Sequence, residues 1–321
     1  MKTVYLILIA TALFFLSFVE FPQADITNGI IKAKFYLPDA QNGYYRGNRF
    51  DWSANMPELE YKGHSYFGQW FTKYSPEIHD VIMGPVEEFT PPLSYSETKP
   101  GNDFMKIGVG ILTKPDDKPY AFSNTYPVLD RGKWNVKKLP DQVQFFHELS
   151  NKEYSYKYEK IVKLVKNKPE MVLDHTLKNT GTKTIETSVY NHNFFVIDKQ
   201  IIGPGCVITF PFNLSGDVTR FKDIAKFDGN KIVFMRELQS AENVYCGDVK
   251  GFGPTAKDYN ITIENKTTGA GVRITCDQPI ERLVFWSCST TACPEPYIKV
   301  KIEPGKEFKW KINYEFYTSA K

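Results

Sequence analysis

Hydrophobic and polar residues alternate along much of the chain with the two-residue period of β-strands. In the segment 308–316, aromatic or aliphatic residues at every second position are separated by lysine, asparagine and glutamate. The segment 171–177 shows the same alternation and places His175 among its apolar positions. A strand with one buried face and one face in water produces this pattern. Both segments are therefore predicted to be strands of antiparallel sheets.

Further strands are expected at short intervals, separated by turn residues such as Asp228-Gly229 and Pro304-Gly305. They are expected near residues 30–37, 106–112, 154–164, 187–196, 207–212, 231–235, 259–264, 271–276 and 283–287. The pattern indicates helices of no more than about three turns. We predict an all-β fold, a sandwich of large antiparallel sheets with few short helices, forming one domain over residues 25–321.

Residues 1–24 have the pattern of an export signal. Lys2 is followed by sixteen uncharged residues from Val4 to Val19, which is short of the roughly 20 apolar residues that span a bilayer. Ala24 is an acceptable last residue of a signal, whereas Pro22 stands where a small residue is preferred. The alternative is therefore that the segment is retained as an N-terminal anchor. Membrane contact is expected only in that case. Either way we predict a periplasmic or extracellular location.

The composition is that of an ordinary globular protein. Of 321 residues, 42% are hydrophobic and 24% charged, which excludes disordered, collagenous and multi-span membrane proteins. The net charge of +3 comes without a basic block, which argues against a nucleic-acid partner. An aromatic share of 15% favours β-structure.

The sequence carries no sign of a cofactor or a metal site. A Gly-rich phosphate loop, a G-x-S-x-G elbow and an H-E-x-x-H motif do not occur. The five cysteines show neither C-x-x-C nor zinc-ligand spacing. They are expected to be buried thiols, with a Cys276–Cys288 bridge as the alternative. The classes of function that remain are acid–base catalysis by histidine and glutamate, and binding without catalysis.

Five histidines occur, and four of them have no evident chemical role. His175 is expected to be a hydrogen-bonded core residue. His64 and His147 have no acidic or nucleophilic residue at a useful spacing, and His79, which precedes Asp80, is a weak candidate.

His192 differs because strand alternation puts it on one face with Tyr190 and Phe194. An imidazole flanked by aromatic rings can line a sugar cleft, since the CH face of a pyranose stacks on aromatic rings. Packing in the core explains the segment equally well.

Carboxylates that could work with a histidine occur in two places. Glu295 lies between Pro294 and Pro296, which fix the backbone and remove two donors. We expect this segment to pair poorly within a sheet and to present one side chain rigidly. Glu87 and Glu88 form an acidic pair bounded by turn residues, for which a solvated loop is the alternative.

Two segments resemble the aldose 1-epimerase (galactose mutarotase) family. The run 173–181, followed by Asn191-His192-Asn193-Phe194-Phe195, is similar to the family's strand and turn before its Asn-His-x-aromatic-aromatic segment. Residues 293–296 resemble the segment that holds the family's catalytic Glu, and residues 302–308 resemble its closing turn and last strand. The resemblance spans about residues 28–318 and implies the family's β-supersandwich.

The resemblance also implies roles for particular residues. His192 and Glu295 match the catalytic pair, while Asn48, Arg49 and Asp258 match residues that hold sugar hydroxyls. A salt bridge is the alternative role for Arg49 and Asp258.

The chain also departs from the family pattern at two places. Glu87 and Glu88 lie in the region where the family usually carries His-Gly-Gly, and Tyr297 replaces a Gln. The two glutamates are expected to border the substrate site, and the sugar is not expected to be that of a standard galactose enzyme.

Three functions compete at this point. The first is an epimerase in which ionised Glu295 takes the proton of the anomeric hydroxyl and protonated His192 donates to the ring oxygen. For this, a nearby carboxylate would have to raise the pKa of His192. The second is a non-catalytic carbohydrate-binding protein, and the third is a glycan-cleaving enzyme that uses Glu87 or Glu88 as an additional acid. In each case the expected partner is a small sugar or a glycan end, and the oligomeric state is not indicated.

Overall fold

The computed structural model of the protein describes residues 20–319, in which β-strands are by far the commonest secondary structure. Most of the expected export signal lies outside the described residues, so export remains a prediction. Its described end belongs to the fold, because Ala24 lies within strand β1 (Gln23–Thr27) and pairs with Phe35. A cut after Ala24 would remove part of a paired strand. Within residues 20–319, no helix is long and apolar enough to cross a membrane.

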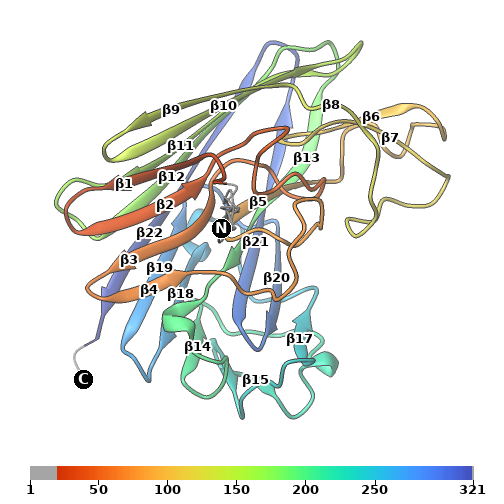
Figure 1. The fold of residues 1–321 in the computed structure, drawn as a ribbon. Helices are drawn as coiled ribbons and strands as arrows, with labels where there is room; N and C mark the ends of the chain where they lie inside the picture. The colour runs from red at the N-terminus through yellow and green to blue at the C-terminus, as the bar shows by residue number, and fades with distance from the viewer. Residues whose placement is uncertain (1–19, 320–321) are drawn as a thin grey trace, which may run out of the picture.

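Ten strands form the larger of two facing sheets (Figure 1). In spatial order they are β15 (Ala225–Asp228), β16 (Lys231–Phe234), β14 (Cys206–Thr209), β18 (Asn260–Asn265), β19 (Ala270–Cys276), β22 (Glu307–Thr318), β12 (Glu170–Asn179), β11 (Ser155–Leu164), β10 (Gln142–Ser150) and β9 (Lys133–Leu139).

A five-stranded sheet lies against it and carries the site described below. Its order is β17 (Asn243–Cys246), β20 (Arg282–Cys288), β21 (Thr291–Ile302), β13 (Ile185–Phe194) and β5 (Gly84–Thr90).

Smaller elements complete the fold, and the sheet β6–β8 projects from one side (Figure 1). They are a four-stranded sheet of β1, β2 (Ile31–Tyr36), β3 (Asn55–Tyr61) and β4 (His64–Phe67), and a three-stranded sheet of β6 (Asp103–Lys106), β7 (Gly110–Thr113) and β8 (Val128–Asp130). The helices found in residues 20–319 are three 3-10 turns, η1 (Ile197–Lys199), η2 (Thr219–Phe221) and η3 (Ala256–Asp258).

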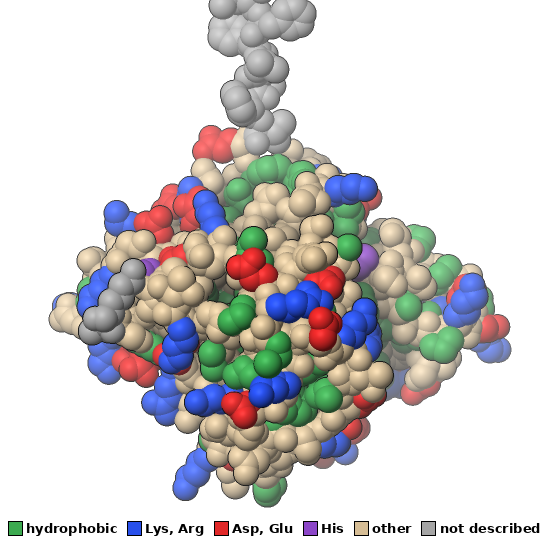
Figure 2. Space-filling view, turned by 90° about the horizontal axis from the view of Figure 1, so that it is seen from below, with side chains coloured by type: hydrophobic (Ala, Val, Ile, Leu, Met, Phe, Trp, Pro, Cys, Tyr) green, Lys and Arg blue, Asp and Glu red, His purple; other side chains and the backbone are tan. Residues whose placement is uncertain are grey.

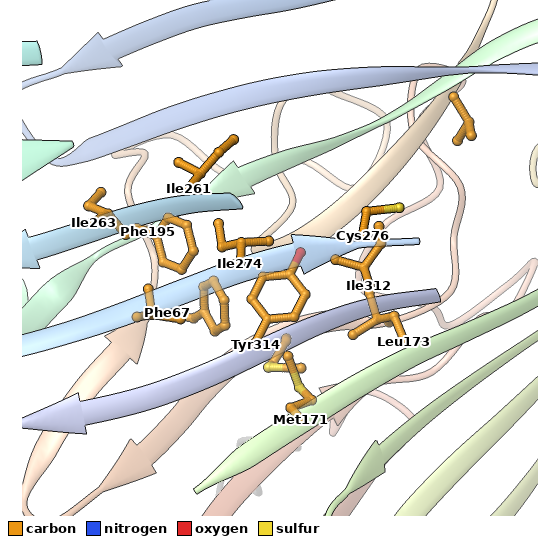
Figure 3. Packing of buried hydrophobic residues seen from close by; sticks show 14 of the residues in the cluster. Phe67, Met171, Leu173, Phe195, Ile261, Ile263, Ile274, Cys276, Ile312 and Tyr314 are labelled. Atoms are coloured by element: carbon orange, nitrogen blue, oxygen red, sulfur yellow. The ribbon is translucent and has the colours of Figure 1, made fainter. Parts of the chain in front are cut away.

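The main hydrophobic core fills the space between the facing sheets. Figure 3 shows Leu173, Ile274, Ile312 and Tyr314 projecting from neighbouring strands of the larger sheet. These residues occupy alternate positions of their strands, as the sequence pattern requires. The all-β prediction and the strands expected at 171–177 and 308–316 are confirmed.

Two details differ from the sequence-based expectations. The strand expected at 106–112 is interrupted, because the chain turns between β6 and β7 and Gly108 and Gly110 both have positive φ. The Cys276–Cys288 bridge does not form, because Cys276 lies in the larger sheet and Cys288 in the five-stranded sheet; all five cysteines are free.

Surface charges of both signs are mixed, at least on the face that Figure 2 shows. There, lysine and arginine side chains alternate with aspartate and glutamate around a patch of apolar side chains. This distribution agrees with the small net charge of +3.

A group of buried charges joins the two facing sheets. Lys160 of β11 contacts Asp51 at 2.7 Å and also pairs with Glu87 of β5. On its other side, Glu87 Oε1 lies 2.7 Å from Nε2 of His175 on β12. All four side chains are completely buried. Burial alone would raise the pKa of Glu87, but Lys160 and His175 hold it at about 2.

Lys160→Met should lower the free energy of unfolding by roughly 3–5 kcal/mol, because two buried carboxylates would lose their cation. Urea denaturation measures this change. Lys163→Met is the matched control, since Lys163 lies on the same strand but is exposed, and its substitution should change stability by less than about 0.5 kcal/mol. Equal effects of the two substitutions would contradict the role given to Lys160.

Candidate active site

The register of β13 and β21 brings His192 opposite Glu295. Tyr190 pairs with Tyr297, and two positions further along each antiparallel strand, on the same face, lie His192 and Glu295. Their Nε2 and Oε1 atoms are 3.2 Å apart. The pair Tyr190–Tyr297 on one side and the bridge Phe195–Ala292 on the other share one register, and this register places His192 and Glu295 opposite each other.

Glu295 is presented from a central strand, which corrects the expectation that its proline-rich segment pairs poorly within a sheet. The ladder between β20 and β21 runs through Pro294 and Pro296 without a break. On the other side, continuous pairing with β13 ends at Tyr297 and returns as an isolated bridge between Ala292 and Phe195. The prolines are tolerated because the ladder to β13 lapses where their missing N–H groups would be needed.

Aromatic rings fix the orientation of His192. Its imidazole stacks on Phe194 with a centroid distance of 3.9 Å and an interplanar angle of 10°. The rings of Phe50 and Trp286 approach it nearly at right angles, at 5.6 and 5.8 Å. Within the described residues, Nδ1 of His192 has no hydrogen-bond partner. Packing therefore holds the ring, and Nε2 is the nitrogen that contacts Glu295.

His192 and Glu295 line a cavity of about 560 Å³. Its floor is the face of the five-stranded sheet that is turned away from the larger sheet, and its walls come from segments outside the five-stranded sheet. The floor residues are Glu88, Thr90, Tyr190, His192, Phe194, Tyr245, Arg282, Val284, Trp286, Glu295 and Tyr297; the wall residues are Arg49, Trp70, Asp80, Tyr120, Ala121, Phe122 and Ser123.

Arg49 is the centre of a polar network on one wall. Its Nε donates to Glu88 at 2.9 Å, its Nη2 donates to the Tyr190 hydroxyl at 3.0 Å, and its Nη1 pairs with Asp80. Lys106 reaches the other oxygen of Glu88 at 2.7 Å. Burial would raise the pKa of Glu88, but Lys106 and Arg49 lower it below its usual range. Arg49 thus combines the salt-bridge role with a place on the cavity wall.

The protonation states of the pair differ from those expected from the sequence. Burial raises the pKa of Glu295 from 4.5 to about 8, against the opposing effect of Arg49. Burial and the positive charge of Arg49 lower the pKa of His192 well below 6.5, although Asp80 acts in the opposite sense. The expected rise in the pKa of His192 is therefore wrong, and near neutral pH the proton is favoured on Glu295.

Four of the seven residues expected at the site line the cavity: Arg49, Glu88, His192 and Glu295. The other three lie elsewhere.

Asn48 donates to the Tyr126 carbonyl at 3.0 Å. Asp258 lies on η3 and accepts a bond from the Gly253 backbone N–H at 2.7 Å. Glu87 points to the opposite face of β5 from Glu88, into the charged cluster of the core. The expectation that Glu87 borders the substrate site is thus not met, because adjacent strand residues face opposite ways.

Several cavity residues were not identified from the sequence. Asp80 was visible only as the neighbour of His79, whose Nε2 lies 3.0 Å from the Asp80 carboxylate. Arg282, Val284 and Trp286 occupy alternate positions of β20, so the alternation places them on one face without showing what that face contacts. Trp70 stacks on Phe194, 124 positions away in sequence, at 4.8 Å.

The other histidines have structural partners. His175 is a core residue as expected, stacked on Trp310 at 4.3 Å. His147 contacts the Tyr156 hydroxyl at 2.9 Å, and His64 contacts Asp198 at 2.9 Å. In the described part of the chain, no group of three or more His, Cys, Asp or Glu residues is arranged to hold a metal ion.

Comparison with solved structures identifies the fold. A galactose mutarotase-like protein from Lactobacillus casei superposes with a TM-score of 0.55 at 13% identity, covering 92% of this chain and 100% of the other. A GalM/aldose epimerase homologue from C. elegans superposes with a TM-score of 0.56 at 12% identity, covering 93% of this chain and 99% of the other. A galactose mutarotase-like protein from Clostridium acetobutylicum superposes with a TM-score of 0.55 at 14% identity, covering 92% of this chain and 95% of the other.

These similarities show that the chain has the galactose mutarotase-like fold, as expected from the sequence. At this level of identity they establish the fold, whereas function depends on the site itself. No protein-family model and no curated relative matches the chain.

Glu295→Gln should make stability less dependent on pH. Because the pKa of Glu295 is raised from 4.5 to about 8 in the folded state, the folded state binds its proton more tightly than the unfolded state. The stability that Glu295 contributes is present below its unfolded pKa and is lost as pH rises towards 8. Glutamine stays neutral throughout.

Thermal melts between pH 5 and 9 measure this effect. The melting temperature of Glu295→Gln should rise relative to wild type as pH increases over the range in which the carboxyl would ionise. Glu186→Gln, on the exposed face of the same sheet, should show no such trend. If the melting temperatures of Glu295→Gln and wild type differed by the same amount at every pH, this result would contradict the raised pKa of Glu295.

Proposed function

We propose that the protein is a carbohydrate epimerase that interconverts the anomers of a sugar by opening and closing its ring. The observation that carries this proposal is the 3.2 Å contact between His192 and Glu295 at the floor of a cavity with aromatic walls. The two oxygens that must exchange a proton, O1 and the ring oxygen O5, are both bonded to C1. Two groups this close together can reach both oxygens of one ring.

Ring opening needs one proton acceptor and one proton donor. Glu295 accepts the proton of the anomeric hydroxyl, the C1–O5 bond breaks as C1=O1 forms, and His192 delivers a proton to O5. Rotation about C1–C2 then presents the other face of the aldehyde. In ring closure His192 takes the proton back from O5 and Glu295 returns one to O1, so both groups regain their starting states. The reaction is an isomerisation and requires no oxidant or reductant.

The neutral form of the pair is compatible with this sequence of steps. A protonated Glu295 beside a neutral His192 carries as many protons as a carboxylate beside an imidazolium. A sugar hydroxyl that donates to the Glu295 carboxylate stabilises its ionised form, and binding then only has to redistribute a proton within the pair. Apart from this redistribution of the proton, Glu295 as the acceptor from the anomeric hydroxyl and His192 as the donor to the ring oxygen have the roles expected from the sequence.

The aromatic and polar walls support a sugar as the ligand. Trp70, Trp286 and Tyr297 offer apolar ring surface, while Arg49, Asp80 and Glu88 supply hydrogen-bonding groups beside it. Pockets of this kind combine apolar walls with a few fixed polar groups that orient the ligand. The solved structures with the same fold include proteins described as galactose mutarotase-like and as an aldose epimerase homologue.

Glu295→Gln and His192→Asn should each lower the rate of anomerisation at least about 100-fold, or roughly 2.7 kcal/mol, because each removes one proton-transfer group. Polarimetry on a panel of freshly dissolved aldoses measures the rate. The double variant should be little slower than either single variant, since both groups serve one cycle. Glu186→Gln is the control and should keep the wild-type rate. Near-normal anomerisation by both single variants would exclude this mechanism.

The rate should depend on pH as a bell-shaped curve. The active pair shares one titratable proton, so kcat/KM should fall as pH rises above about 8, where Glu295 loses that proton. It should fall again at acid pH, well below 6.5, where His192 gains one. The two apparent pKa values read from this profile belong to the coupled pair and not to either residue alone. A profile that is flat from pH 5 to 10 would contradict proton transfer by these groups.

A further inference from the structure

The cavity is larger than one hexose requires. An aldohexose has twelve non-hydrogen atoms, and even at the roughly 30 Å³ that a water molecule occupies in the liquid they would fill at most about 360 Å³. The cavity measures about 560 Å³. A single hexose at the His192–Glu295 pair would therefore leave a substantial part of the cavity to water.

The extra space extends along the sheet, towards β17. Glu295 is on β21, Trp286 on the neighbouring β20, and Tyr245 on β17 beyond it, where Tyr245 pairs with Trp286. All three line the cavity. Two strand spacings of about 4.8 Å separate β21 from β17, or about 10 Å in total. This distance exceeds the span from O1 to O4 of one pyranose ring.

Tyr245 has a fixed position at this outer end. Its ring lies close to Gly247, where an added Cβ would come within 2.7 Å of the tyrosine hydroxyl, so a side chain at residue 247 would have to displace the ring. The guanidinium of Arg220 lies 4.7 Å from the centre of the ring.

Arg282 adds polar groups at the same end. Its Nε and Nη2 donate to the Gly247 carbonyl at 3.2 and 3.0 Å. Its Nη1 has no hydrogen-bond partner in the part of the chain that the structure describes. An aromatic ring held in place next to a guanidinium with spare donors is a suitable surface for a sugar ring and its hydroxyls.

We propose that the substrate is the reducing end of an oligosaccharide, with the terminal ring at His192 and Glu295 and the preceding ring against Trp286, Tyr245 and Arg282. This inference rests on the proposed function only for the chemistry at the terminal ring. Binding of the second ring follows from the size of the cavity and from its outer residues.

The experiment compares disaccharides with the monosaccharide at their reducing end. Maltose, cellobiose and lactose are paired with glucose, mannobiose with mannose, and galactobiose with galactose. Calorimetry gives the dissociation constants, and polarimetry with chromatography of the products gives anomerisation and cleavage. At least one disaccharide should bind about tenfold more tightly than its monosaccharide, which corresponds to about 1.4 kcal/mol.

Variants at Tyr245 locate the second ring. Tyr245→Ala should reduce the affinity ratio of that disaccharide to its monosaccharide at least fivefold, whereas Tyr245→Phe keeps the ring and should preserve the ratio. Equal binding of every disaccharide and its monosaccharide, or a ratio that Tyr245→Ala leaves unchanged, would overturn the inference.

The two proposals can fail separately. Tight, Tyr245-dependent disaccharide binding without anomerisation, or with release of a monosaccharide, would support the second ring site and reject the epimerase. Anomerisation with no preference for disaccharides would support the epimerase and reject the second ring site.

Discussion

The ion pairs of Lys160 with Asp51 and Glu87 hold together the parts of the molecule that build the site. Lys160 projects from the larger sheet, Asp51 from the loop that also carries Arg49, and Glu87 from β5. A single buried charge costs several kcal/mol, so separating any of these segments would be strongly unfavourable. The wall with Arg49 and the sheet with His192 are thereby kept at a fixed distance. Because His175 also contacts Glu87, the central strand β12 is tied to the same point.

The strands of the site use their two faces for different purposes. On β5, Glu87 faces the core cluster and Glu88 the cavity. On β13, Asn191 donates to Glu87 at 3.1 Å, while the next residue, His192, faces the cavity. Asn193 then donates to the Pro294 carbonyl at 2.9 Å and accepts from the Tyr314 hydroxyl at 2.8 Å. The hydrogen bonds of one face fix the backbone that presents the side chains of the other.

Two buried glutamates show how local partners decide the chemistry of a carboxyl group. Glu87 and Glu295 are both removed from water, which by itself raises the pKa of each. Glu87 has an ammonium and an imidazole within hydrogen-bond distance, and its pKa is about 2. Glu295 has His192 beside it and, within residues 20–319, no lysine or arginine in direct contact, and its pKa is about 8. Glu87 is therefore suited to holding the structure together, and Glu295 to proton transfer near neutral pH.

The sequence by itself determined the elements and much of their surface pattern. Alternation identified strands such as 171–177 and 308–316, and it put Tyr190, His192 and Phe194 on one face. The resemblance of two short segments was enough to name His192 and Glu295 as candidates. These features are local, since they depend on residues within one strand or turn.

Only the tertiary structure decided which faces meet. The sequence indicated an acidic pair bounded by turn residues at Glu87 and Glu88, whereas the structure places both on β5, and the packing of β5 decides which carboxylate enters the core and which the cavity. The approach of Trp70 to Phe194, the placement of the Asn48 and Asp258 side chains outside the cavity lining, and the low pKa of His192 depend on contacts between distant segments. Periodicity cannot encode such contacts, because it records the direction of a side chain along its own strand and not what lies opposite.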